Sequence, residues 1–181
     1  DLVSSVTIKI NDYKEAVEKA IANAQDMGAT ADDKLGLGIN TTIDKSKDAA
    51  ADAEGQTQAY SIYTATTFDA DGKITSNVID ASQATVKFDA AGKISTDLTA
   101  PVKTKVELGD EYGMRGASKI GKEWFEQAAS FSEDALGKTS EEVAAIAVDG
   151  GKATDADLVS SVTVGIDEFQ LVIEKAAATA K

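Results

Sequence analysis

The sequence predicts an α+β fold, in which an antiparallel meander sheet packs against helices. Two observations predict this class: strand-like segments come first along the chain, and amphipathic helical segments follow them. A third is that the chain closes on a strand–helix unit at its C-terminus. With 181 residues, 43% of them apolar, the chain can bury one substantial hydrophobic core.

Three segments have the composition of strands. Residues 35–43 (LGLGINTTI), 58–68 (QAYSIYTATTF) and 74–81 (ITSNVIDA) contain many β-branched and aromatic residues. Residues 44–56, between the first two, are instead rich in Asp, Lys and Ala. We therefore expect a mobile or partly helical stretch there.

Two similar turns join and follow these strands. FDADGKI at 68–74 and FDAAGKI at 88–94 repeat one pattern 20 residues apart. Gly72 and Gly92 stand where a hairpin turn favours a positive φ angle. The turns predict a meander of about four strands, which the chain leaves at Pro101, its only proline.

Two helices are predicted after the meander. KIGKEWFEQAASFSEDAL at 119–136 places its apolar residues near one face, as an amphipathic helix does. A second helix is predicted over 140–148, because Thr139 and Glu142 have the spacing of a capping box.

An internal repeat with an offset of 156 residues organises the chain. DLVSSVT stands at 1–7 and again at 157–163, and residues 1–25 and 157–181 are identical at 13 of 25 positions. An offset of this size corresponds to one ordinary domain rather than to a solenoid unit of roughly 20–50 residues. We therefore predict that residues 1–25 match the end of a preceding unit and that 26–181 form one complete domain of a tandem array. Duplication of one strand–helix element within a single domain is the alternative.

Each copy of the repeat predicts a strand followed by a helix. In the first copy, residues 5–10 alternate between apolar and polar residues, and 12–24 follow a helical period. In the second copy, the alternation places Ser161 and Thr163 on the outer face of a strand. The residues expected to face inward are Val162, Val164 and Ile166 on the strand, and Phe169, Ile173, Ala176 and Ala180 on a helix that Asp167 caps.

The composition excludes several classes of function. The net charge of −13 disfavours nucleic acid and anionic lipid as partners. Because the chain has no Cys and no His, it lacks disulfides, thiolate metal sites and the commonest nucleophile–base pairs. No apolar run is long enough for a membrane span, and no signal peptide is visible.

Residues 110–124, DEYGMRGASKIGKEW, contain the only Arg and the only Trp of the chain. The side chains of Tyr112, Met114 and Trp124 would make a flat apolar wall for a planar ring. The other interpretation is a loop anchored by Trp124 in the core. The sequence leaves both open.

Three other patterns do not carry a function. DADG at 69–72 lacks the later ligands of a calcium loop, so we interpret it as a turn. GLG at 36–38 lacks the later glycine of a dinucleotide-binding loop. No pair of acidic residues is spaced as an isolated acid–base couple, so we predict no catalytic residue, no metal site and no enzymatic activity.

The repeated motif resembles the flavin acceptor motif of FMN-binding domains. D-x-x-S-S-V-T is similar to D-x-x-S-G-A-T, in which the Thr carries FMN through a phosphoester bond. Asp157, Ser160 and Thr163 match the motif, whereas Ser161 replaces Gly and Val162 replaces Ala.

The resemblance also marks secondary candidates. Asp1, Ser4 and Thr7 would form an equivalent acceptor in the first copy. GAS at 116–118 is a weaker candidate, because Arg115 occupies the Ser position. The residues expected to bind the cofactor are Thr163, Asp157, Ser160, Ser161, Thr7, Asp1, Ser4, Tyr112, Met114, Gly116, Ser118 and Trp124.

Further segments extend the resemblance to this family. The family typically has an early DGKI hairpin and a helix after the acceptor, here DADGKI and DEFQLVIEKAAATA. YGMRGASKIGKEWFEQA also resembles a segment of lipoprotein relatives from anaerobic Gram-positive bacteria.

The resemblance implies an extracellular electron-transfer module, attached to the cell surface in the parent protein and carrying covalent FMN. The implied partners are a flavin transferase, a redox protein or quinone-linked reductase, and neighbouring repeat units. The alternative is a non-redox surface module for binding or spacing that keeps the fold without the flavin.

Overall fold

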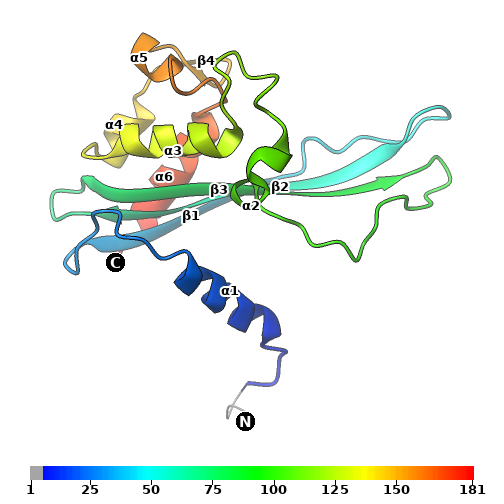
Figure 1. Ribbon diagram of the computed structural model, residues 1–181, viewed down its shortest axis with the longest axis horizontal. Helices are drawn as coiled ribbons and strands as arrows, with labels where there is room; N and C mark the ends of the chain where they lie inside the picture. Colours follow the sequence, from blue (N-terminus) through cyan, green and yellow to red (C-terminus); the bar gives the residue numbers. More distant parts are fainter. Residues whose placement is uncertain (1–5) are drawn as a thin grey trace.

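A three-stranded antiparallel sheet forms the centre of the fold (Figure 1). The structure, a computed structural model, describes residues 6–181. The strands lie in the order β1 (Lys34–Thr42), β2 (Gly55–Phe68) and β3 (Ile74–Phe88). β1 pairs with residues 60–68 of β2 only, so the rest of the β2–β3 hairpin extends as a two-stranded ribbon.

Helices cover one face of this sheet (Figure 1). α6 (Asp167–Thr179) packs on β1 and β2, and α3 (Trp124–Ala135) packs on β3. The other elements of this layer are α2 (Lys105–Leu108), the 3-10 turn η1 (Gly109–Tyr112), α4 (Ser140–Ala144), β4 (Val148–Asp149), β5 (Lys152–Ala153) and α5 (Ala156–Val159). The predicted α+β class is confirmed.

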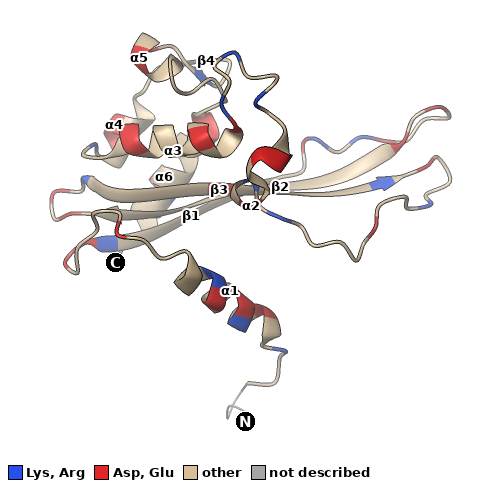
Figure 2. Ribbon diagram, in the orientation of Figure 1, with Lys and Arg blue, Asp and Glu red and all other residues tan. Residues whose placement is uncertain are grey.

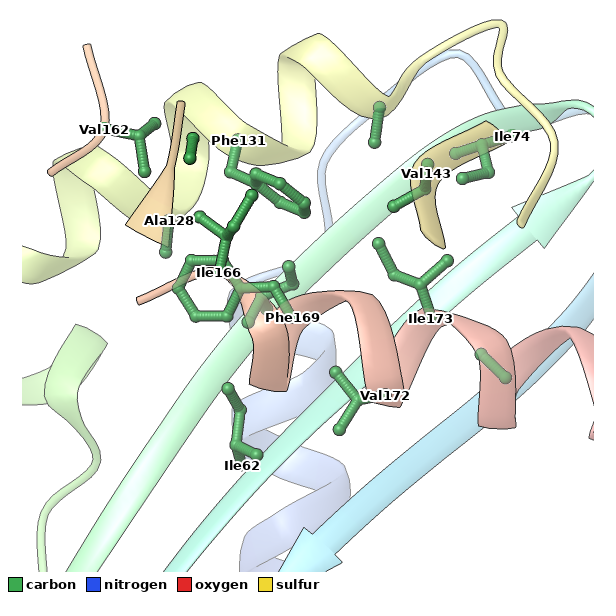
Figure 3. Close-up of a cluster of buried hydrophobic side chains, with 14 of the residues drawn as sticks. Ile62, Ile74, Ala128, Phe131, Val143, Val162, Ile166, Phe169, Val172 and Ile173 are labelled. Carbon is green, nitrogen blue, oxygen red and sulfur yellow. The ribbon is translucent and has the colours of Figure 1, made fainter. Parts of the chain in front are cut away.

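The hydrophobic core lies between the sheet and the helices (Figure 3). Phe131 of α3 and Phe169 of α6 lie at its centre, with ring centroids 5.2 Å apart. Ile62 reaches them from β2, where alternate residues face the helices and are buried. The period-2 pattern of the strands and the helical period of α3 and α6 thus converge on one core.

Both predicted turns form, with the same geometry. In each, an Asp side chain accepts hydrogen bonds from backbone N–H groups two and four residues later, Asp69 in the first turn and Asp89 in the second. Gly72 and Gly92 have φ angles of 78° and 80°. The glycine positions were therefore predicted correctly.

The predicted number of strands was wrong: the meander has three strands, not about four. After the second turn the chain makes two isolated bridges to β3, Phe88 to Ile94 and Ser82 to Thr104, without forming a fourth strand of this sheet in the described residues. Within residues 95–102, Asp97 turns the backbone by accepting from Thr99 N, and Pro101 has no N–H to donate to a neighbouring strand. Residues 44–54 contain turns and isolated bridges but no helix.

The two helices after the meander form with shorter bounds than predicted. α3 begins at Trp124 because residues 113–122 make an irregular loop, in which Gly121 has a φ of 64°. α4 ends at Ala144, and Thr139 and Glu142 form the predicted capping box.

The strand predicted in each copy of the repeat was wrong. In the second copy, residues 156–159 form α5, and 160–166 are turns with one bridge between Gly165 and Lys152. In the first copy, residues 6–10 form no strand, while 1–5 lie outside the described residues. Val162 and Ile166 are buried as expected, whereas Val164 is only half-buried, like Ser161 and Thr163, so the predicted burial pattern was right only in part.

The helix predicted in each copy is present and begins at the equivalent residue. α1 (Asn11–Ala22) starts at Asn11, and α6 starts at Asp167, which is 156 residues later. The residues just before them, Ile10 and Ile166, have nearly the same φ angles, −111° and −110°. Asp167 is therefore the first helical residue and not the N-cap that the sequence predicted.

The two helices differ in burial. α6 buries Phe169 and Ile173 in the core, whereas α1 buries no residue and lies beyond the opposite face of the sheet (Figure 1). The stripe of Tyr13, Val17 and Ile21, 58–72% exposed, faces solvent. The same local sequence thus forms the same helix whether or not a core covers it.

Acidic residues are distributed over the helices and turns rather than gathered at one place (Figure 2). No helix in the described part of the chain is long and apolar enough to cross a membrane.

Candidate functional site

A pocket of about 610 Å³ opens between α2, α3, the start of α6 and the segment 162–165. We call it the Thr163 pocket. Its volume lies within the range of about 300–1,000 Å³ that is typical of small-molecule sites. Its walls include Tyr60, Lys105, Met114, Trp124, Thr163 and Glu168.

Gln127 of α3 fixes the backbone that carries Thr163. Its side-chain Oε1 accepts hydrogen bonds from Thr163 N at 2.8 Å, Val164 N at 3.1 Å and Thr163 Oγ1 at 3.1 Å. Gln127 is fully buried, and its Nε2 donates to the carbonyl oxygen of Lys122 at 3.1 Å. Because one rigid side chain holds both backbone N–H groups, the hydroxyl of Thr163 is presented at a fixed place on the pocket wall.

The residues before Thr163 are held by a short helix and not by a strand. Asp155 caps α5 by accepting from Asp157 N and Leu158 N. Leu158 and Val162 are buried on one side of the turn that follows. The apolar residues therefore anchor the turn in the core and leave Thr163 half-buried at the pocket.

Three residues of the predicted acceptor motif lie away from the pocket wall. Asp157 is exposed on α5. Ser160 Oγ donates to Asp157 O at 2.6 Å, and Ser161 Oγ donates to Leu158 O at 3.2 Å. These hydroxyls satisfy carbonyl groups of α5, so of the four predicted residues in this copy Thr163 alone lines the Thr163 pocket.

The equivalent residues of the first copy have no comparable setting. Asp1 and Ser4 lie outside the described residues, and Thr7 is exposed in the segment before α1.

The cluster at 110–124 contributes three of its five predicted residues to the pocket. Met114, Ser118 and Trp124 line it, whereas Tyr112 and Gly116 do not. Trp124 is also a core residue, because its ring makes an edge contact with Phe169 at 5.7 Å between centroids. Trp124 therefore anchors the loop in the core and also forms part of a pocket wall, whereas the predicted wall of three side chains is incomplete because Tyr112 lies outside the pocket lining.

Glu123 anchors the loop that carries Met114. Its buried carboxylate accepts from Arg115 N at 2.7 Å and from Met114 N at 2.9 Å. The Arg115 side chain closes the same loop by binding Asp110 and Glu126. The loop is irregular in conformation but is tied to the start of α3 by charge-assisted hydrogen bonds.

Lys105 is the most unusual residue of the site. Only 6% of it is exposed, and its ammonium lies over the rings of Tyr60, Tyr112 and Trp124, at 4.8, 4.9 and 4.6 Å from their centroids. Burial lowers the pKa of Lys105 to about 8, although the negative charges of Glu168 and Asp80 oppose this shift. Burial also raises the pKa of Glu168 above its usual range.

The pKa of Lys105 leads to a prediction on stability. Between its folded value of about 8 and its unfolded value of 10.5, the folded chain binds fewer protons than the unfolded chain. The free energy of unfolding should therefore rise by about 1–2 kcal/mol from about pH 8 to about pH 10, where tyrosine ionisation ends the window. Below this window the cost of the buried charge is fully present, so Lys105→Met should be at least as stable as the wild type at neutral pH.

Urea unfolding of wild type and Lys105→Met across this pH range measures the effect. The rise should appear in the wild type and vanish in the variant, since other titrating groups are common to both. If the difference in free energy of unfolding between the two proteins did not change with pH, the lowered pKa of Lys105 would be contradicted.

Sequence reasoning missed Lys105, Gln127, Tyr60 and Glu168. Each lies far along the chain from Thr163 or on a different element, and no local spacing marks it. Gln127 is buried on α3 three residues after Trp124, but no local pattern of the sequence indicates a partner for its amide.

Comparisons of the chain with protein-family models, with curated proteins and with solved structures find no match.

Proposed function

We propose that this chain is an electron-transfer module that carries FMN esterified to Thr163. The observation that carries the proposal is the position of Thr163. This residue lines a pocket of about 610 Å³ together with Met114 and Trp124. When bound, FMN supplies the redox chemistry, so the protein itself needs neither His nor Cys.

The pocket residues fit a flat, partly apolar group with an anionic end. Trp124, Met114 and Tyr60 supply apolar and aromatic surface, and Lys105 supplies a positive charge. The side chain of Gln127 holds the segment that carries Thr163 in place by accepting hydrogen bonds from the backbone N–H groups of Thr163 and Val164. Because the pocket is open to solvent, a noncovalent cofactor could be lost outside the cell. A covalent bond to Thr163 would retain it there.

We further propose that the chain is part of a tandem array at the cell surface. The apolar stripe of α1 matches the stripe that α6 buries, so it would pack on the sheet of a preceding unit. The partners would be a flavin transferase, neighbouring units, and a redox protein or quinone-linked reductase. No catalytic residue is proposed.

The test of attachment is the intact mass of the chain after co-expression with a flavin transferase. We expect the wild type to gain the mass of one FMN group and a yellow colour, and Thr163→Ala to gain neither. Thr7→Ala is the matched control, since it removes the hydroxyl of the first copy, and it should be modified like the wild type. An unmodified wild type, or a Thr163→Ala variant that still carries flavin, would refute the proposal.

A second candidate function is a non-redox surface module with the same fold. Ser161 and Val162 replace the Gly and Ala of the acceptor motif, and Val162 is packed in the core. The Thr163 hydroxyl is also engaged with Gln127. This candidate predicts a colourless protein from the native source, and a bound flavin in that preparation would eliminate it.

A further inference from the structure

The ammonium of Lys105 has no hydrogen-bond acceptor and no ion-pair partner among residues 6–181. The ion pairs of the described residues involve other lysines and Arg115, and the contacts found for Lys105 Nζ are aromatic rings. An ammonium has three N–H donors, and rings satisfy its charge only in part. No fully buried side-chain nitrogen among the described residues lacks a partner, so the Lys105 ammonium must reach solvent in the pocket, where water or an anion can accept its hydrogen bonds.

The ammonium is directed to the pocket. Two of the rings beneath it, Tyr60 and Trp124, themselves line the Thr163 pocket, as Lys105 does, while Tyr112 lies outside the lining. An anionic group that enters the pocket from solvent would therefore meet Lys105 between two aromatic walls.

The charge of the pocket differs in sign from that of the chain. The lining contains Lys105, Lys119 and Lys152 but a single carboxylate, Glu168, although the whole chain has a net charge of −13. Lys119 and Lys152 are exposed, so they add attraction near the pocket and Lys105 provides the buried contact.

We propose that the Thr163 pocket binds a small anionic ligand with a planar apolar body, and that Lys105 receives its anionic group. The aromatic walls suit the planar body, and the unpaired ammonium suits a phosphate or carboxylate. This binding is noncovalent and does not depend on modification of Thr163, so it goes beyond the proposed function.

The experiment compares FMN with riboflavin, which has the same rings but no phosphate. Both are titrated into unmodified protein from a host without a flavin transferase, and binding is followed by quenching of flavin fluorescence. We expect FMN to bind at least about tenfold more tightly than riboflavin near neutral pH, as a charge-assisted contact would require. Lys105→Met should remove this preference, and Lys105→Arg should restore most of it.

The preference should also depend on pH in the wild type. It should decline as the pH rises through about 8, where Lys105 loses its proton. Glu168 and Asp80 are the carboxylates that face Lys105, and the raised pKa values of Tyr60 and Tyr112 keep these phenols neutral in this range. This arm needs no variant, so it remains decisive if Lys105→Met fails to fold.

Lys119→Met is the matched control, because it removes an exposed lysine of the same pocket; it should keep most of the preference. Thr163→Ala should also keep it, which separates this inference from covalent attachment. Failure of FMN to bind, equal binding of the two flavins, or an unchanged preference in Lys105→Met would overturn the proposal.

Discussion

Replacement of Gly38 by alanine should destabilise the domain by about 4 kcal/mol or more, a large part of the roughly 5–15 kcal/mol that keeps an ordinary domain folded. A Cβ atom at Gly38 would lie 1.8 Å from the carbonyl oxygen of Val172 and 2.8 Å from its carbonyl carbon. Both atoms belong to the backbone of α6, which cannot give way as a flexible side chain does. The whole helix would have to move away from β1.

Such a movement would break contacts that hold α6 to the edge strand. Thr179 Oγ1 accepts from Leu37 N at 3.0 Å and donates to Leu37 O at 2.9 Å, and Lys175 Nζ donates to Ile39 O at 3.0 Å. The start of α6 carries Phe169 in the core and Glu168 in the Thr163 pocket. Loss of the packing at Gly38 should therefore damage the core and the site together.

Urea unfolding followed by circular dichroism measures this effect. Gly116→Ala is the matched control, because a Cβ atom at Gly116 meets nothing within 4 Å; we expect a change of less than about 0.5 kcal/mol. Equal stability of Gly38→Ala and Gly116→Ala would show that α6 does not pack on β1 as described.

The role of Gly36 and Gly38 illustrates a limit of the sequence analysis. GLG at 36–38 lies within β1, where its two glycines pack against α6, and this packing role was not predicted. A Cβ atom at Gly36 would lie 2.0 Å from the carbonyl oxygen of Ala176, some 140 residues later in the chain. No local pattern specifies that a helix will approach a strand so closely, because the approach depends on tertiary packing.

Features with a local cause were predicted well. The two Asp–Gly turns and the Thr139–Glu142 capping box depend on side chains that bond their own backbone within four residues. The helix of each repeat copy also begins at the same position in both environments. These elements follow from short-range geometry, so the sequence alone suffices for them.

The strand predicted before α6 failed because alternation is not specific to strands. Val162 and Ile166 are buried and Thr163 lies at the surface of the pocket, as in the prediction. However, the Asp155 cap starts a helix at Ala156, and the buried residues anchor a turn after it. The predicted position of Thr163 at the surface was thus right, although the strand conformation predicted for this segment was wrong.

The site was predicted only in part. Thr163, Met114, Ser118 and Trp124 share the pocket, and two motifs distant in sequence pointed to them. Lys105 was not foreseen, because a lysine in a short polar segment is ordinarily solvated. Its burial depends on the ring of Tyr60 in β2 and on the rings of Tyr112 and Trp124 in the 110–124 cluster, which only the folded structure brings together around it.

Replacement of Gln127 by leucine should lower the free energy of unfolding by about 2–4 kcal/mol, because it leaves Thr163 N and Val164 N without their acceptor. The Lys122 carbonyl would also lose a donor. Leucine has nearly the same side-chain volume as glutamine, so the loss of stability should come from unpaired polar groups rather than from a cavity. The backbone around Thr163 should become mobile, and attachment of any group to its hydroxyl should fall even where the variant remains folded.

Hydrogen exchange of the Thr163 and Val164 amides separates this effect from general destabilisation. Gln170→Leu is the matched control: its Nε2 donates to Val143 O and Ile146 O at 2.9 Å each, so its loss should loosen the end of α4 and leave the Thr163 segment protected. Gln127→Leu should instead speed exchange at 163 and 164 under conditions where the core amides of α6 stay protected. If both variants exposed the Thr163 amide equally, Gln127 would be one of many stabilising residues. If only Gln127→Leu lost protection at the Thr163 and Val164 amides, the side-chain amide of Gln127 would be identified as the group that holds the Thr163 hydroxyl at the pocket.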